Sequence, residues 1–124
     1  MNKISGSEAV RKIESEFPEL TSELHDETWE GMLHLQISVF SQLAQHTIDE
    51  GDRLSFKRIC ELFLELFRNG SDELVNALNV SFLEHLNFED AKKLRLWAYE
   101  QMPSEMRRAY EEMEEYNRQL HGNR

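Results

Sequence analysis

Apolar side chains recur along most of this chain at intervals of three and four residues, the spacing that places them on one face of an α-helix. The pattern is clearest over residues 29–48 and 56–67. In the second stretch, Leu62 and Leu66 widen the apolar stripe, which indicates a helix buried on two sides. The periodicity therefore predicts a chain that is helical almost throughout.

Capping and helix-breaking residues divide this pattern into elements. Ser5 or Ser7 can cap a first helix, which is expected to end near Phe17 because Pro18 disfavours helical geometry in the residue before it. Residues 19–28 are acidic and only weakly periodic. This stretch is therefore expected to be either a short helical turn or a loop.

Small residues mark the boundaries of the central helices. Gly51–Asp52 is expected to end the helix over residues 29–48, and Ser55 is a suitable N-cap for the next helix. Asn69–Gly70 is expected to supply the left-handed residue that commonly ends a helix, and Ser71 is expected to start another. The connections between these helices are thus only a few residues long.

Two further helices are expected towards the C-terminus. Asn87 is a suitable N-cap for the first of them, with Asp90 at its third position and Trp97 on its apolar side. Pro103 suits the first turn of a last helix, which is strongly amphipathic. Because Trp29 and Trp97 both fall on apolar stripes, both are expected in the core.

The expected fold is all-α, a single compact domain over residues 1–124 with five to seven antiparallel helices. Short connections favour antiparallel neighbours. Two prolines and five glycines are too few turn residues for a protein of many short strands. Hydrophobic residues make up 40% of the chain and aromatic residues 10%, which is typical of a chain that folds around a core. The pattern leaves open whether the helices form a bundle or a short stack of helical hairpins.

The charge of the chain narrows the class of its partners. Its 24 Asp and Glu against 14 Lys and Arg give a formal net charge of -10. Such a charge repels nucleic acid and anionic membranes, and it attracts basic proteins over long range. We therefore expect a basic protein partner and neither nucleic acid nor membrane.

The residues that usually carry chemistry are sparse. The single cysteine, Cys60, excludes a disulfide within the chain and lies on an apolar stripe, so it is expected in the core. The chain has no glycine-rich phosphate loop, no Glu-x-x-His di-iron pair and no cysteine–histidine cluster with zinc spacing. No catalytic residue, cofactor or metal is therefore expected, and we predict that the protein is not an enzyme.

Targeting segments are also absent from the sequence pattern. No stretch has the apolar length of a signal peptide or of a membrane span. A lone cysteine without a partner agrees with a reducing compartment. A cytoplasmic protein is therefore expected.

Acidic residues gather in three groups along the chain. One lies between residues 14 and 30, one at residues 49–52, and one at residues 111–115. Runs of this kind are often solvated helix faces, but three of them on one small chain favour a binding role. The candidate partner-binding residues are Glu23, Asp26, Glu27, Glu30, Asp49, Glu50, Asp52, Glu111, Glu112 and Glu115.

The middle third of the chain resembles a known group of proteins. The resemblance lies in Gly51–Asp52, Lys57, Asn69–Gly70 and the string NALNVSFLEHL over residues 76–86. These features are similar to those of small, acidic, all-helical bacterial proteins, among which are immunity proteins of contact-dependent growth inhibition. The resemblance implies a cytoplasmic protein that binds a toxin domain, often a basic nuclease, and covers its positive cleft with an acidic surface.

Two alternatives remain at this point. The first is a helical adaptor or regulatory protein that binds a peptide or a partner helix in an apolar groove. The second is an enzyme that pairs a histidine with a carboxylate, for which His34 and His46 near Glu30 and Asp49 are the candidates. An exposed apolar cleft would favour the first, and close histidine–carboxylate pairs would favour the second.

Overall fold

The computed structural model describes residues 3–90 and 92–121, and these residues form an all-α fold. The α-helices are α1 (Gly6–Glu16), α2 (Thr21–Leu24), α3 (Leu33–Glu50), α4 (Arg53–Asn69), α5 (Asp72–Ala77), α6 (Leu96–Gln101) and α7 (Ser104–His121). Short 3₁₀-helices are η1 (Pro18–Leu20) and η3 (Leu83–His85), and η2 (Leu78–Phe82) is a π-helix. Within the described ranges there is no β-strand, only an isolated parallel bridge between Ile4 and Gly70. The predicted fold class is confirmed.

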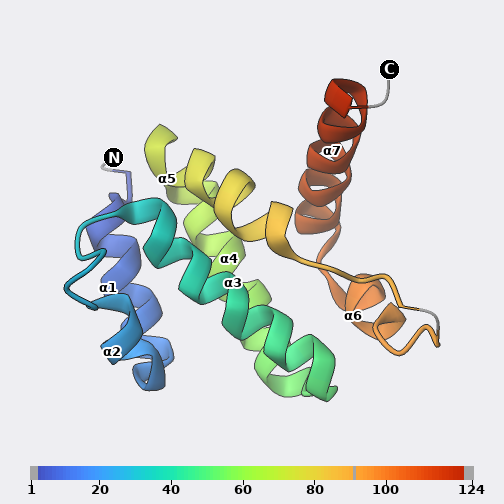
Figure 1. The fold of residues 1–124 in the computed structure, drawn as a ribbon, viewed down its shortest axis with the longest axis horizontal. Coiled ribbons are helices and arrows are strands. Elements are labelled where there is room, and N and C mark those ends of the chain that lie inside the picture. The colour runs from blue at the N-terminus through green and yellow to red at the C-terminus, as the bar shows by residue number, and fades with distance from the viewer. Residues whose placement is uncertain (1–2, 91, 122–124) are drawn as a thin grey trace.

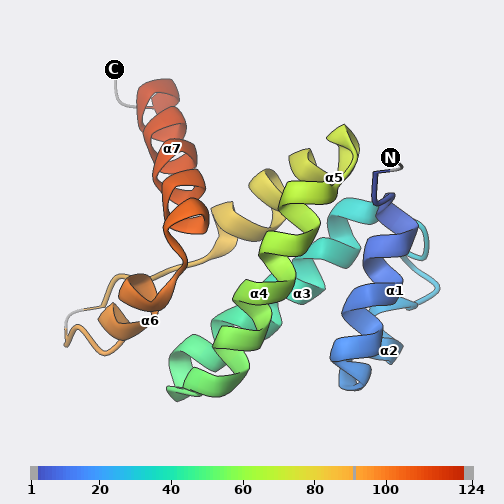
Figure 2. The same cartoon turned by 180° about the vertical axis from the view of Figure 1, so that it is seen from behind.

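The hairpin of α3 and α4 forms the centre of the molecule. Figures 1 and 2 show α1 and α2 on one side of this hairpin and α6 and α7 on the other. The continuous run of α5, η2 and η3 packs on both central helices and leads towards the foot of α7. The central hairpin thus separates the N-terminal helices from the C-terminal ones.

Phenylalanine rings join these elements into one core. Phe82 of η2 lies 4.9 Å from Phe40 of α3 and 5.1 Å from Phe63 of α4, measured between ring centroids. All three side chains are fully buried. Phe17, just after α1, adds a further ring 6.2 Å from Phe40. Because each aromatic pair contributes about 0.5–1.5 kcal/mol beyond its buried area, this cluster stabilises the packing of α1, α3, α4 and η2 together.

A second aromatic group holds the C-terminal helices. Phe88 packs edge-on against Tyr99 of α6 at 5.7 Å and against Tyr110 of α7 at 5.1 Å. Trp97 of α6 makes an edge contact with Phe56 of α4 at 5.5 Å. Trp97 is half-buried at the edge of the core, and it anchors α6 to the central hairpin.

The N-terminal boundaries agree with the sequence. Ser5 caps α1 in a reciprocal capping box: its hydroxyl accepts from the Glu8 backbone N–H, and its own N–H donates to the Glu8 carboxylate. The helix ends at Glu16, as predicted. Residues 19–28 contain both of the expected alternatives, because η1 and the short α2 are followed by a turn.

The predicted helix start at Trp29 is wrong, because α3 begins at Leu33. Gly31 has φ +82°, a left-handed conformation that does not continue a helix. The Trp29 indole N–H donates to the Glu23 carbonyl oxygen at 2.6 Å, and the ring is half-buried outside the core. Trp29 therefore secures the turn between α2 and α3, although its spacing matches the stripe of α3.

Two smaller boundary predictions are also wrong. The N-cap of α4 is Asp52, whose carboxylate accepts from the Ser55 backbone N–H at 3.2 Å, so Ser55 lies inside the helix. Gly70 is not left-handed, since its φ and ψ are -79° and 155°. Gly51 does adopt the left-handed conformation after α3, with φ +69°.

The predicted helix beginning at Asn87 does not form. Residues 86–90 are irregular, and α6 starts only at Leu96. The Asp90 carboxylate accepts from the backbone N–H groups of Leu94 and Arg95 at 2.7 and 2.9 Å. Lys93 has a positive φ of 57°. Asp90 thus closes a turn before α6 instead of occupying the third position of a longer helix.

A steric constraint explains why glycine occupies position 70. Backbone bonds from Ile4 N–H to the Asn69 carbonyl and from Ser71 N–H to the Ile4 carbonyl, both 2.8 Å, tie the N-terminal segment to the α4–α5 junction. A Cβ atom at residue 70 would lie 2.4 Å from the Leu66 carbonyl oxygen and 2.9 Å from Leu74 Cδ2. The chain can form this junction only without a side chain here.

We therefore predict that Gly70→Ala lowers the free energy of unfolding by about 1–3 kcal/mol or more, the range for overpacking. The matched control is Gly51→Ala, where a Cβ atom would meet nothing within 4 Å and only the left-handed backbone is penalised, by about 1–2 kcal/mol. Urea unfolding of both variants measures the difference. A smaller loss for Gly70→Ala than for Gly51→Ala would contradict the steric explanation.

A histidine links α1 to the segment that follows α2. His25 Nδ1 lies 2.9 Å from a Glu30 carboxylate oxygen, and His25 Nε2 lies 3.1 Å from the Glu14 carboxylate. The hydrogen bonds to Glu30 and Glu14 raise the pKa of His25 above its ordinary value of 6.5. The bond from His25 also lowers the pKa of Glu14. The linkage is therefore strongest when the imidazole is protonated and both carboxylates are ionised.

This linkage predicts a pH dependence of stability. A raised histidine pKa stabilises the fold below pH 6.5, and that contribution is lost as the pH rises through the folded-state pKa. The stability difference between wild type and His25→Gln should therefore be larger at about pH 6 than at about pH 8 in urea unfolding. His85→Gln is the control, since His85 is exposed and bonds to no side chain in the described ranges. An unchanged His25→Gln difference across this interval would refute the linkage.

Candidate functional site

The net charge of the protein lies in one segment of the sequence. Residues 13–52 contain ten Asp and Glu and no Lys or Arg. The other 14 acidic residues are matched in number by the 14 Lys and Arg elsewhere in the chain. The first two acidic groups predicted from sequence both fall within this segment, so they account for the formal charge of -10.

Seven of these carboxylates gather at one end of the molecule, which we call the acidic end. They belong to the last turn of α1, to η1, to α2 and to the turn that follows, elements that pack against one another. Figure 1 shows this end beyond α3, on the opposite side from α7. The residues of the acidic end are Glu14, Glu16, Glu19, Glu23, Asp26, Glu27 and Glu30.

Some carboxylates of the acidic end are already engaged. Glu14 and Glu30 bind His25, and Glu16 accepts from Arg58 of α4 at 3.1 Å. The half-buried Asp26 accepts from the Thr28 backbone N–H at 2.8 Å. These four carboxylates therefore stabilise the local structure of the acidic end and are less available to an external partner.

Three other carboxylates at this end face solvent without an internal partner. Glu19, Glu23 and Glu27 are exposed, and their carboxylates make no hydrogen bond or ion pair with any residue that the structure describes. A carboxylate that faces water and has no internal partner is available to pair with a Lys or Arg of a binding protein. Of the predicted residues in this group, Glu23 and Glu27 are thus the freest to bind.

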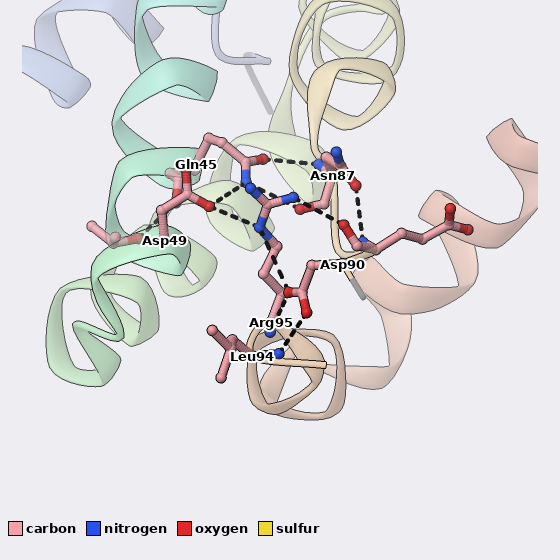
Figure 3. A network of polar contacts seen from close by, with 9 residues as sticks. Gln45, Asp49, Asn87, Asp90, Leu94 and Arg95 are labelled. Atoms are coloured by element: carbon pink, nitrogen blue, oxygen red, sulfur yellow. Dashed lines mark hydrogen bonds and ion pairs between the residues drawn. The ribbon is translucent and has the colours of Figure 1, made fainter. Parts of the chain in front are cut away.

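Asp49 has a structural role. Arg95 Nε donates to the Asp49 carboxylate at 2.9 Å, and the Gln45 amide donates to the same oxygen at 3.0 Å (Figure 3). The Gln45 amide also bonds to the backbone N–H and carbonyl of Asn87, at 2.8 and 3.0 Å. This network holds the irregular segment before α6 against α3, so Asp49 stabilises the fold at the place where sequence predicted a partner contact.

Asp52 and Glu50, the remaining residues of the second group, differ in whether their carboxylates are already bound within the protein. Asp52 caps α4, and the hydrogen bonds from Ser55 lower the pKa of its carboxyl. Glu50 is exposed in the turn between α3 and α4, and its carboxylate pairs with no residue in the described ranges. Only Glu50 in this group is therefore free to bind.

The third group lies on α7, well away from the other two (Figure 1). The Tyr99 hydroxyl donates to Glu111, and this bond raises the pKa of Tyr99. Glu115 accepts from Arg118 at 2.6 Å. Glu112 is exposed and has no internal partner among the described residues. The three acidic groups therefore form separate surfaces, and the fold does not merge them into one.

The histidine–carboxylate pairs required by the enzyme alternative do not form as predicted. Glu30 pairs with His25, whereas His34 Nδ1 lies 2.7 Å from the Ser81 hydroxyl. A serine within hydrogen-bond reach of a histidine can be an activated nucleophile. Ser81 is only 5% exposed, however, so its hydroxyl has little access to a substrate. The pair instead ties the start of α3 to the π-helix.

Neither Cys60 nor any cluster of possible metal ligands in the described ranges forms a reactive site. Cys60 is buried in α4, as predicted, and burial raises the pKa of its thiol to about 12. No three His, Cys, Asp or Glu side chains in residues 3–90 and 92–121 are grouped so that they could hold a metal ion. Over the same ranges, no helix combines the length and apolarity needed to cross a membrane.

The sequence prediction omitted a set of exposed apolar residues. Val80 of η2 and Tyr116 and Leu120 of α7 are 44%, 62% and 58% exposed. Val80 and Tyr116 line a groove between η2 and α7. The sequence did contain a signal for this surface, because the apolar stripe of the last helix extends to Leu120. A stripe alone, however, does not reveal which part of it stays exposed in the folded protein.

Comparison with known proteins gives one match. No curated protein and no solved structure matches this chain. A family model described as "Domain of unknown function (DUF7674)" matches residues 10–118, which include most of α1, all of α2 to α6 and most of α7. The chain therefore belongs to the DUF7674 family.

Proposed function

We propose that this protein is a non-enzymatic immunity protein that binds a basic bacterial toxin domain, such as a nuclease, and blocks its positively charged cleft. The toxin would be bound in the cytoplasm, without a cofactor. The observation that carries the proposal is the concentration of charge: residues 13–52 hold ten carboxylates and no Lys or Arg. The resemblance of residues 51–86 to small acidic immunity proteins points the same way.

The placement of this charge suits rapid capture of a basic protein. At physiological ionic strength the Debye length is about 8 Å, so neighbouring carboxylates act together while distant ones are screened. The acidic end brings seven carboxylates from four adjoining elements to one part of the surface. Such a field raises association rates by factors of about 10–10³, which serves an antidote that must act before its toxin does.

Within the acidic end, Glu23 and Glu27 are the proposed contact residues. Both are exposed, and neither carboxylate is bound by a side chain in the described ranges. Asp26 and Glu30, between and beside them, support the local structure through Thr28 and His25. We assign the acidic groups at the α3–α4 turn and on α7 a weaker contribution to capture.

The second candidate function is an adaptor that binds a partner helix in a groove. The specific observation in its favour is the apolar groove between η2 and α7. The helix α7, which lines this groove, lies across the molecule from α1 and α2 of the acidic end (Figure 1). The two candidates therefore predict binding at different places, and they can be separated by mutation.

The immunity proposal predicts protection of cells. Cells that express the toxin domain encoded beside this gene should grow when this protein is co-expressed, and the two proteins should purify as a complex. The physical reason is burial of the toxin's basic cleft by carboxylates. Growth assays and co-purification measure the two effects. If the protein neither binds that product nor protects the cells, the immunity proposal is wrong.

Charge reversal locates the contact surface. Glu23→Lys/Glu27→Lys should weaken toxin binding by at least about tenfold, mainly through slower association at low salt. Glu112→Lys/Glu115→Lys changes the net charge by the same amount at a distant surface, so it controls for the loss of overall attraction. We expect a clearly smaller effect from this second pair, measured by surface plasmon resonance at two salt concentrations. Equal losses for both pairs would argue against the acidic end as the contact surface.

A further inference from the structure

A groove separates α7 from the helical run of α5, η2 and η3. Figures 1 and 2 show these two elements diverging from a common base near the centre of the molecule. The groove has a volume of about 440 Å³. Phe67 of α4 lines its base, Val80 lies on the η2 side, and Met113 and Tyr116 lie on the α7 side.

The apolar face of α7 is covered over only part of its length. Met106, Ala109 and Tyr110, in the first half of the helix, are buried against the core. Further along the same face, Met113 is half-buried, and Tyr116 and Leu120 are mostly exposed. An amphipathic helix usually buries its whole apolar stripe, so the second half of α7 presents a face that lacks a partner.

The charges beside this face are acidic. Glu84 of η3 and Glu112 of α7 line the groove from opposite sides, and no basic side chain of the described residues lines it. Neither carboxylate makes a hydrogen bond or ion pair with a residue in the described ranges. The other polar lining residues are the asparagines Asn76, Asn79 and Asn117. An apolar floor between two unpaired carboxylates is complementary to an apolar ridge flanked by cations.

We propose that this groove binds an amphipathic α-helix of a partner protein, with an apolar stripe flanked by Lys or Arg. The stripe would cover Val80, Met113 and Tyr116, and the flanking cations would pair with Glu84 and Glu112. Anchors at positions i, i+3 or i+4 and i+7 would follow the length of the groove. The inference specifies the partner of the adaptor function, the second candidate above, and it does not depend on the toxin assignment.

A helix from a second copy of this chain is a poorer occupant. The amphipathic helix α7 is exposed along its second half, and its apolar stripe is accompanied by four glutamates at residues 111–115. Placing this helix in the groove of another copy would bring those glutamates towards Glu84 and Glu112. Like charges at close range oppose such a contact, whereas a basic helix relieves the repulsion.

The test uses the full-length protein and a synthetic peptide as the probe. The peptide has about 18 residues, long enough to be helical, with leucines at i, i+3, i+4 and i+7 and lysines elsewhere. Fluorescence anisotropy measures its affinity, and methyl NMR locates its contacts. We expect chemical shift changes at Val80 and Met113, and at least about tenfold weaker binding to Val80→Arg. A peptide of the same composition in scrambled order should bind at least about tenfold more weakly than the amphipathic one.

A matched variant separates groove binding from general attraction. Leu54→Arg also places an arginine at an exposed apolar site, since Leu54 is 79% exposed, but it lies at the start of α4 outside the groove. Its affinity for the peptide should stay within about twofold of wild type. The double variant Glu84→Gln/Glu112→Gln should weaken binding and flatten its salt dependence, because it removes the two paired charges.

Several results would overturn the proposal. These are no measurable peptide binding, equal losses for Val80→Arg and Leu54→Arg, or equally tight binding of a leucine–glutamate peptide. A dimer in light scattering that Val80→Arg dissociates would assign the groove to a second copy instead. If Val80→Arg still protects cells from the toxin, the immunity proposal stands whatever the peptide shows. A failure of Glu23→Lys/Glu27→Lys to reduce toxin binding would leave the groove proposal intact.

Discussion

The packing of Phe82 between the two central helices is the contact on which the rest of the structure depends. Its ring lies against Phe40 of α3 and Phe63 of α4, so the π-helix is anchored across the hairpin. The buried Ser41 hydroxyl donates to the Phe82 carbonyl at 2.9 Å, which secures a backbone group at the end of η2. These contacts fix the position of η2 next to α7. The π-helix therefore forms one wall of the groove between η2 and α7. The position of Val80, two residues before Phe82, follows from the same contact.

Charge and apolar surface are divided between opposite sides of this core. The acidic end depends on α1 and α2, which pack on α3, whereas the groove depends on η2, α4 and α7. Several carboxylates outside these two sites act within the fold. Asp52 caps a helix, Asp49 holds Arg95, and Glu111 receives the Tyr99 hydroxyl. Some carboxylates thus support the fold, whereas unpaired ones, such as Glu23 and Glu27 at the acidic end and Glu112 beside the groove, remain free to attract a partner.

Several helices could be predicted from local sequence because their signals are local. The Ser5 capping box, the left-handed Gly51 and the Ser71 cap each depend on a few neighbouring residues. The wrong boundaries arose where side-chain contacts, and not helical spacing, decided the outcome. Trp29 has helical spacing, yet its indole bonds to Glu23, and the predicted helix at Asn87 gives way to contacts with Gln45. Glycine is required at position 70 because a side chain there would clash with Leu66 and Leu74, and not because of its backbone angles.

The sequence by itself determined the all-α class, most helix ends and the charge of -10, because periodicity, caps and composition are properties of the chain alone. It also identified carboxylates as the candidate contacts. Only the tertiary structure decided which of them remain free, since the engagement of Asp49 or Glu30 depends on residues brought close by folding. The groove likewise exists only after packing, because covering the first half of α7 leaves Tyr116 and Leu120 exposed. Local patterns specify helices, whereas the surfaces between helices arise from long-range packing.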